Sequence, residues 1–228
     1  AFESPFPEAL QRFVDKHEQE KDGFGDALWQ ILEGKKKGCW IWWILPQVAG
    51  EVLHHTGGKR DGSSESRRFA LEGLREATAF LDHSFLGKNY FACVRAIREQ
   101  VEPLGPKGGQ GRTLNEIFGE TEAKKVRCSV TLFRRAAGWS SQLSDKSYRE
   151  LAANCDAILV AALSDGHRPC EHVAKVCSSA ERIQLFERLG REVLYQLTPF
   201  PGRDTFPSPD DLTVKVHYLT ATLPQGGN

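Results

Sequence analysis

The sequence predicts an all-α fold, and three observations lead to that prediction. Apolar residues recur with the 3.6-residue period of a helix along most of the chain. Capping patterns, such as Thr113 followed by Glu116, precede several of these apolar stripes. No strand–helix alternation and no Gly-rich phosphate loop interrupts them. We therefore expect a single-domain bundle of about seven helices over residues 1–197, with a Pro-rich C-terminal extension over residues 198–228.

The expected helices have recognisable starts and stops. Asp26 and Ser84 are the expected N-caps of the second and fourth helices, Gly34 ends the second, and Ser147 with Glu150 caps the sixth. Residues 48–66 and 102–111 are expected to be loops, and residues 213–219 alternate like a lone strand. The periodicity places helices over residues 7–19, 26–32, 66–81, 84–101, 121–137, 147–163 and 171–197, with a short turn at 117–118.

The fifth helix has the clearest apolar stripe. Its members are spaced i, i+4, i+7 and i+11, so they share one face and should be buried. The stripe consists of Val126, Val130, Phe133 and Ala137, whereas Lys124, Arg127, Thr131, Arg134 and Arg135 fall away from it.

Charge and hydropathy narrow the functional classes. The 228 residues carry 30 Lys and Arg against 30 Asp and Glu, so the net charge is zero. A neutral chain does not coat nucleic acid by bulk charge, although a local basic patch can still bind it. The apolar runs are too short to span a bilayer, and no secretory pattern opens the sequence. We therefore expect a cytoplasmic protein without a membrane partner.

The cysteines indicate neither a disulfide framework nor a metal site. Six cysteines follow no repeating spacing, which is typical of reduced thiols in the cytosol. His167, Cys170, His172 and Cys177 form the densest group of metal-capable side chains. Their spacing fits no common zinc template, so we expect no metal and no cofactor.

The rest of the chain is organised around the stretch GKKKGCWIWWILPQ, residues 34–47. On a helix Trp40 and Trp43 share a face, whereas on a strand Trp40 and Trp42 do. In either geometry one indole ring is left to wall a pocket beside the preceding lysines. The alternative interpretation is that the whole segment belongs to the core.

Four ordered blocks resemble one family. Residues 34–47 form the first block, and residues 69–77, 80–87 and 117–133 form the others. Together they resemble a widespread, uncharacterised all-helical family of unknown function, sometimes mislabelled calpastatin-like. This chain has Cys39 where the family has His, Cys128 where it has Ser, and Ile41 and Val130 where it has Met. Residues 51–56 replace a Gly/Ser-rich segment of the family.

These departures point to a specialised branch, which resembles the fungal arginine-containing cyclodipeptide synthases. The resemblance implies that the enzyme takes arginine from Arg-tRNA and a second amino acid from another aminoacyl-tRNA. It would join them into a cyclic dipeptide, cyclo(Arg-Xaa). Both esters are already activated, so neither ATP nor a metal is required.

That chemistry needs a nucleophile, a base and a site for a guanidinium group. Ser129 is the first candidate nucleophile, with Lys125 four residues earlier as its base, and Cys39 and Cys128 are alternates. His83 is the candidate acid or base. The candidate substrate-binding residues are Trp40, Trp42, Trp43, Gln47, Glu76, Asp82 and Glu116.

The tRNA should meet a local group of basic residues. We expect this group to consist of Lys35, Lys36, Lys37, Arg67, Arg68, Lys124, Arg127, Arg134 and Arg135. The competing hypothesis is a non-catalytic helical module. Such a module would bind a nucleotide, an ADP-ribose-like ligand or a partner protein through a cleft at residues 40–43, which we call the tryptophan segment.

Overall fold

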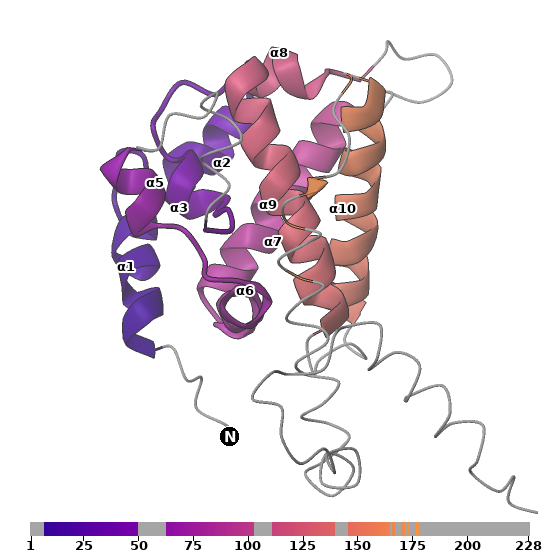
Figure 1. The fold of residues 1–228 in the computed structure, drawn as a ribbon. Coiled ribbons are helices and arrows are strands. Elements are labelled where there is room, and N and C mark those ends of the chain that lie inside the picture. Colours follow the sequence, from indigo (N-terminus) through magenta and orange to yellow (C-terminus); the bar gives the residue numbers. More distant parts are fainter. Residues whose placement is uncertain are drawn as a thin grey trace, which may run out of the picture. The chain divides into compact units, whose positions relative to one another are not determined.

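The computed structural model describes residues 7–49, 63–102, 111–139 and 146–164, together with five single positions up to Cys177. All of them belong to the first of two compact units, Ala1–Ala180, and the second is Glu181–Asn228. The described segments are helical with one isolated β-bridge, which confirms the all-α prediction (Figure 1). The helices are α1 (Pro7–His17), α2 (Phe24–Leu32), α3 (Ile41–Ile44), α5 (Ser64–Arg68), α6 (Leu74–Asp82), α7 (Leu86–Val101), α8 (Leu114–Phe118), α9 (Glu120–Trp139) and α10 (Lys146–Ser164).

Helix α9 packs against α6, α8 and α10, while α7 packs against α2, α6 and α10 (Figure 1). The predicted stripe of α9 is confirmed, because Val126, Val130, Phe133 and Ala137 are all at most 1% exposed. Thr131 is also buried, against the prediction, and its hydroxyl accepts a hydrogen bond from the Cys170 N–H. That contact comes from a distant part of the chain, so the helical period did not indicate it.

Aromatic rings fill the centre of this unit. Phe80 meets Phe13 edge-on, with ring centroids 5.2 Å apart, and Phe133 at 5.4 Å. Tyr90 lies 4.0 Å from Phe133, and Phe69 lies 5.5 Å from Phe13. Such pairs add about 0.5–1.5 kcal/mol each to the free energy gained by burying apolar area. The rings tie α1, α6, α7 and α9 together.

Several predicted helix ends are wrong. The expected helix 66–81 is two helices, because the chain leaves α5 at Phe69 and re-enters helix after Gly73, whose φ is +154°. Helix α2 begins after Gly23, and Asp26 lies in its first turn. Ser84 is not the N-cap of α7, because Phe85 holds that position, and the His83 ring Nδ1 accepts from the N–H groups of Phe85 and Leu86.

Other predicted starts are confirmed, are wrong or fall outside the described residues. Thr113 and Glu116 form the complete capping box at the start of α8. The predicted cap of the sixth helix is wrong, because α10 begins at Lys146 and Ser147 lies inside it. The cluster around residue 170 lies partly outside the described residues, as do most of the expected helix 171–197, the boundary at 197/198 and the expected strand 213–219.

None of the described helices is both long and apolar enough to cross a membrane. Within the same residues, no three His, Cys, Asp or Glu side chains lie close enough together to hold a metal ion.

His17 anchors the tryptophan segment to the core. It is 4% exposed, and its Nε2 lies 2.9 Å from the carbonyl oxygen of Trp43. Its Nδ1 lies 3.1 Å from the Asn89 side-chain amide nitrogen. The neutral tautomer satisfies both contacts, with Nε2–H donating to the carbonyl and Nδ1 accepting from Asn89. Burial, the largest effect, lowers the pKa of His17 to about 4.

We expect stability to fall as the pH drops from about 6.5 to about 4. In this window the unfolded chain binds a proton at His17 and the folded chain does not, so acid favours unfolding. The full effect of His17 is of the order of 3 kcal/mol. Urea unfolding of the wild type and of His17→Gln at several pH values measures it. Equal slopes of stability against pH in the two proteins would contradict the assignment.

Candidate functional site

The loop that carries the lysines and Cys39 is fixed by one buried side chain, Gln30. Its Oε1 accepts hydrogen bonds from the backbone N–H of Lys37 at 2.7 Å and of Gly38 at 2.9 Å. The same oxygen accepts from the indole Nε1–H of Trp40 at 2.9 Å. Three donors on one buried amide oxygen leave the loop little freedom, and losing Gln30 would leave the buried Trp40 indole N–H without its acceptor.

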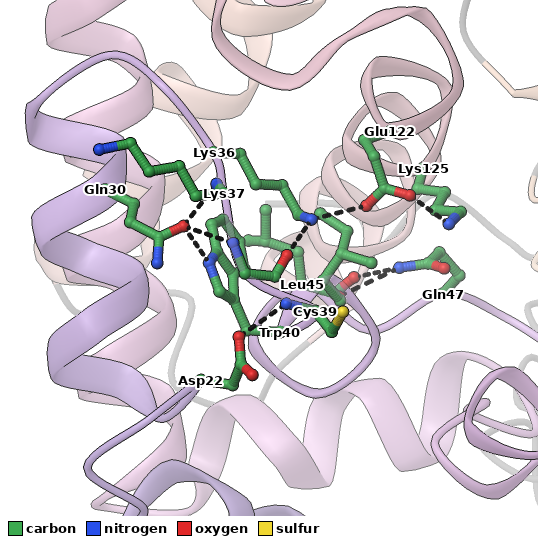
Figure 2. Close-up of polar contacts among 12 residues, drawn as sticks. Asp22, Gln30, Lys36, Lys37, Cys39, Trp40, Leu45, Gln47, Glu122 and Lys125 are labelled. Carbon is green, nitrogen blue, oxygen red and sulfur yellow. Dashed lines mark hydrogen bonds and ion pairs between the residues drawn. The ribbon is translucent and has the colours of Figure 1, made fainter.

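Two aspartates, Asp22 and Asp26, complete this framework from the other end of α2, and Figure 2 shows the contact between Asp22 and Cys39. The Asp22 carboxylate accepts from the backbone N–H of Cys39 at 2.6 Å, and the Asp22 carbonyl accepts from the Trp43 indole at 2.8 Å. Asp26 accepts from the Asp22 N–H and from the Gln30 amide, both at 2.9 Å. These bonds, the backbone one first, lower the pKa of Asp26 and keep it ionised.

A charged group lies on the other side of the same loop, where Figure 2 shows the side chains of Lys36 and Lys125 meeting Glu122. The Lys36 Nζ is 3.2 Å from the Glu122 Oε2, and the Lys125 Nζ donates to the Oε1. The Lys125 Nζ also lies 3.8 Å above the ring centroid of Trp42, a close cation–π contact. We call Lys36, Trp42, Glu122 and Lys125 the lysine–tryptophan cluster.

The tryptophan segment is helical, which is one of the two geometries, helix or strand, that the sequence allowed. Trp40 and Trp43 are buried, at 0% and 4% exposed, whereas Trp42 is only partly buried. The odd ring is therefore Trp42, and it is the ring beside Lys125. The indole N–H groups of Trp40 and Trp43 donate to Gln30 and Asp22, respectively. Both tryptophans are therefore core residues in this structure.

The predicted pair of Ser129 and Lys125 is not formed. Ser129 is completely buried, and its hydroxyl lies 3.2 Å from the hydroxyl of Tyr90. Burial raises the pKa of Tyr90, so the two groups form a neutral hydrogen bond inside the core. Lys125 instead pairs with Glu122 and Trp42. A fully buried hydroxyl is out of reach of a tRNA end, which argues against Ser129 as the nucleophile.

The other candidate catalytic residues lie in different settings. Cys39 is exposed on the fixed loop, whereas Cys128 is buried. His83 is half-buried at the junction of α6 and α7, where it caps α7. This capping contact is the structural alternative to a role as acid or base.

The candidate carboxylates do not converge on the tryptophan segment. The buried Glu76 holds Arg12 at 2.7 Å and accepts from the Glu72 N–H, so it links α6 to α1. Asp82 accepts from the Tyr148 hydroxyl, and Glu116 belongs to the capping box of α8. Gln47 is buried, and its amide donates to backbone carbonyls of its own segment.

The candidate tRNA-binding residues have different contacts. Lys36 is in the lysine–tryptophan cluster, and Lys37 lies 5.4 Å above the exposed Trp29 ring. Arg68 lies above Phe69, Lys124 pairs with Glu120, and Arg134 pairs with Asp156 on α10. The Arg127 guanidinium contacts the Cys128 sulfur at 3.6 Å. Lys35 and Arg67 are exposed, and Arg135 is half-buried.

Sequence reasoning missed Gln30, Asp22 and Glu122. Gln30 sits on the apolar face of α2, next to Ile31, and a lone glutamine there was the only local signal. Glu122 precedes Lys125 by three residues, a spacing that allows a helical ion pair. Nothing local indicates that Lys36, from a loop far away in the sequence, shares the same carboxylate.

Comparisons with known proteins give a family and a fold. Residues 7–152 match the family described as "Protein of unknown function (DUF1810)". No curated protein matches the chain. The crystal structure of the conserved hypothetical protein Rv1873 from Mycobacterium tuberculosis is similar, with a TM-score of 0.55 and 26% identity. The match covers 75% of this chain and 97% of that one.

Proposed function

Because this chain belongs to the DUF1810 family of proteins of unknown function, we propose its activity from its sequence and site. We propose a tRNA-dependent, arginine-containing cyclodipeptide synthase of the fungal kind. The observation that carries the proposal is the position of Cys39. This exposed thiol follows Gly38, whose carbonyl accepts from Lys36 of the lysine–tryptophan cluster, and its backbone is fixed by Asp22. The esters come from the cytoplasmic pool of aminoacyl-tRNAs.

The proposed reaction balances without ATP, metal or redox cofactor. The Cys39 thiolate attacks the ester carbonyl of Arg-tRNA, a C–S bond forms, and the C–O bond to the tRNA ribose breaks. The ribose oxygen leaves with a proton. The α-amine of the bound arginine then attacks the second aminoacyl ester and releases the second tRNA. Finally the free amine of the new dipeptide attacks the thioester, which closes the ring and regenerates the thiol.

Residues around Cys39 fit individual steps of this reaction. A thiolate is a stronger nucleophile than a serine hydroxyl. Trp42 offers an aromatic ring and Glu122 a carboxylate, the two partners that a guanidinium group prefers. Gln30 and Asp22 hold the loop in one conformation, which reduces the entropic cost of aligning the thiol with an ester.

One observation favours the second candidate function, a non-catalytic module. His83 caps α7 and Ser129 bonds Tyr90, so neither candidate for proton transfer or acyl transfer from those helices joins Cys39. A module would use the lysine–tryptophan cluster to bind a nucleotide or an ADP-ribose-like ligand without turnover.

Mass spectrometry of extracts from cells that express the protein tests the proposal. We expect cyclic dipeptides that contain arginine, and their arginine should carry the isotope label of supplied arginine. Purified protein with Arg-tRNA and a mixture of other aminoacyl-tRNAs should give the same product, and ribonuclease treatment should remove it. If neither experiment gives an arginine-containing product, the synthase proposal fails and the module remains.

A further inference from the structure

The lysine–tryptophan cluster carries more positive charge than it neutralises. The side chains of Lys36 and Lys125 are only 10% and 11% exposed, and that of Glu122 is 23% exposed. Among the described residues, Glu122 is the ion-pair partner of both lysines. Two largely buried ammonium groups and one carboxylate leave one positive charge in excess, and such a charge is costly to keep away from water without a counter-charge.

The same cluster has an unused acceptor. The Oε2 of Glu122 is buried and has no hydrogen-bond partner among the described residues, although the Lys36 Nζ lies 3.2 Å away. The Lys36 ammonium also donates to the carbonyl of Gly38, and it forms an ion pair with this oxygen. A hydroxyl group of a ligand would add a hydrogen bond to the Oε2.

The third feature is the Trp42 indole. It is the one of the three neighbouring tryptophans that is not fully buried, and one of its faces is covered by Lys125. Indole rings stack on nucleobases, and this contact is worth about 1–3 kcal/mol per base.

We propose that this cluster is a ribonucleotide site. The phosphate group of the nucleotide lies between the ammonium groups of Lys36 and Lys125 and neutralises the excess charge. A ribose hydroxyl donates to the Oε2 of Glu122, and the base stacks on Trp42. The assignment of this nucleotide to the 3′ end of an aminoacyl-tRNA rests on the proposed function, and the nucleotide site itself does not. Lys125 is thereby a phosphate ligand and not the base that the sequence predicted.

Adenosine 5′-monophosphate is the probe, and quenching of tryptophan fluorescence together with calorimetry gives its dissociation constant. We expect binding to the wild type, and binding at least about tenfold weaker for adenosine, which lacks the phosphate. The 2′,3′-dideoxy form of the nucleotide should also bind several-fold more weakly, because it cannot donate to Glu122. Equal affinities for all three compounds would overturn the site.

Variants at lysines inside and outside the cluster make the test specific. Lys125→Met and Lys36→Met should each weaken nucleotide binding by about tenfold or more. Lys88→Met and Lys146→Met are the matched controls, because each removes the same charge from an exposed helical position outside the cluster, and both should bind within about twofold of the wild type. Equal losses in all four variants would show nonspecific charge attraction and overturn the proposal. Lys125→Met should remain folded, because it leaves Glu122 paired with Lys36 alone, and its melting temperature checks this.

Two further experiments test whether the nucleotide is the end of a tRNA and distinguish failure of the nucleotide site from failure of the synthase proposal. Deacylated tRNA should displace the mononucleotide from the wild type, and a failure to do so overturns the tRNA assignment. Nucleotide binding that depends on Lys125, without any cyclic dipeptide, would support the site and overturn the synthase. Cyclic dipeptide formation with no effect of Lys125→Met or Lys36→Met on nucleotide binding would overturn the site and leave the synthase.

Discussion

Replacing Trp40 with alanine is expected to destabilise the protein by about 3–5 kcal/mol, the usual cost of deleting a fully buried large aromatic side chain. Trp40 is completely buried, and its ring meets Phe118 edge-on at 6.3 Å. The substitution also removes one of the three donors on the Gln30 oxygen and loosens the loop that follows α2. The loss of stability should therefore be accompanied by disorder around Cys39.

Urea unfolding followed by far-ultraviolet circular dichroism measures this effect independently of tryptophan fluorescence. Trp29→Ala is the matched control, because Trp29 is 53% exposed and its ring lies 5.4 Å from the Lys37 Nζ at the surface. It should cost no more than about 1 kcal/mol. Similar losses for the two variants would contradict the role of Trp40 as the central residue of its segment.

Replacing Cys39 with alanine is expected to reduce formation of the arginine-containing cyclic dipeptide by at least about a thousandfold, because it removes the proposed acyl acceptor. Cys39 is exposed, so the melting temperature should stay within a degree or two of the wild type. Cys39→Ser keeps a weaker nucleophile and should retain part of the activity. Intact-protein mass spectrometry should detect an arginyl thioester on the wild type after brief exposure to Arg-tRNA alone.

Ser129→Ala is the control for the nucleophile. It should lose about 1–3 kcal/mol of stability, because it leaves the buried Tyr90 hydroxyl without its partner, and it should still form product. Full activity in Cys39→Ala would contradict the assignment. If Ser129→Ala were then folded but inactive, Ser129 would be the nucleophile. If both variants were active, the amine of one substrate would attack the other ester directly.

Local periodicity determined much of this fold. The stripe Val126, Val130 and Phe133 and the capping box of Thr113 depend on residues within a few positions of each other, so the sequence alone identified them. Helix α3 shows the limit of this reasoning. Its sequence fits a helix or a strand. The helix is the geometry in which the Trp40 indole binds Gln30 of α2 and the Trp43 indole binds Asp22 of the turn before α2.

The candidate site was decided by tertiary structure. Ser129 and Lys125 have the right spacing to meet on one face of a helix, yet Ser129 pairs with Tyr90 from α7 and Lys125 with Trp42 from α3. Helical spacing specifies which side chains can meet within α9, but it cannot specify which partners other elements bring to the same face. By itself the sequence determined that an all-helical protein presents a lysine-rich, tryptophan-rich segment. Only packing determined that Trp42 is the partly exposed ring and that Lys36 and Lys125 share Glu122, because those contacts join residues from distant parts of the chain.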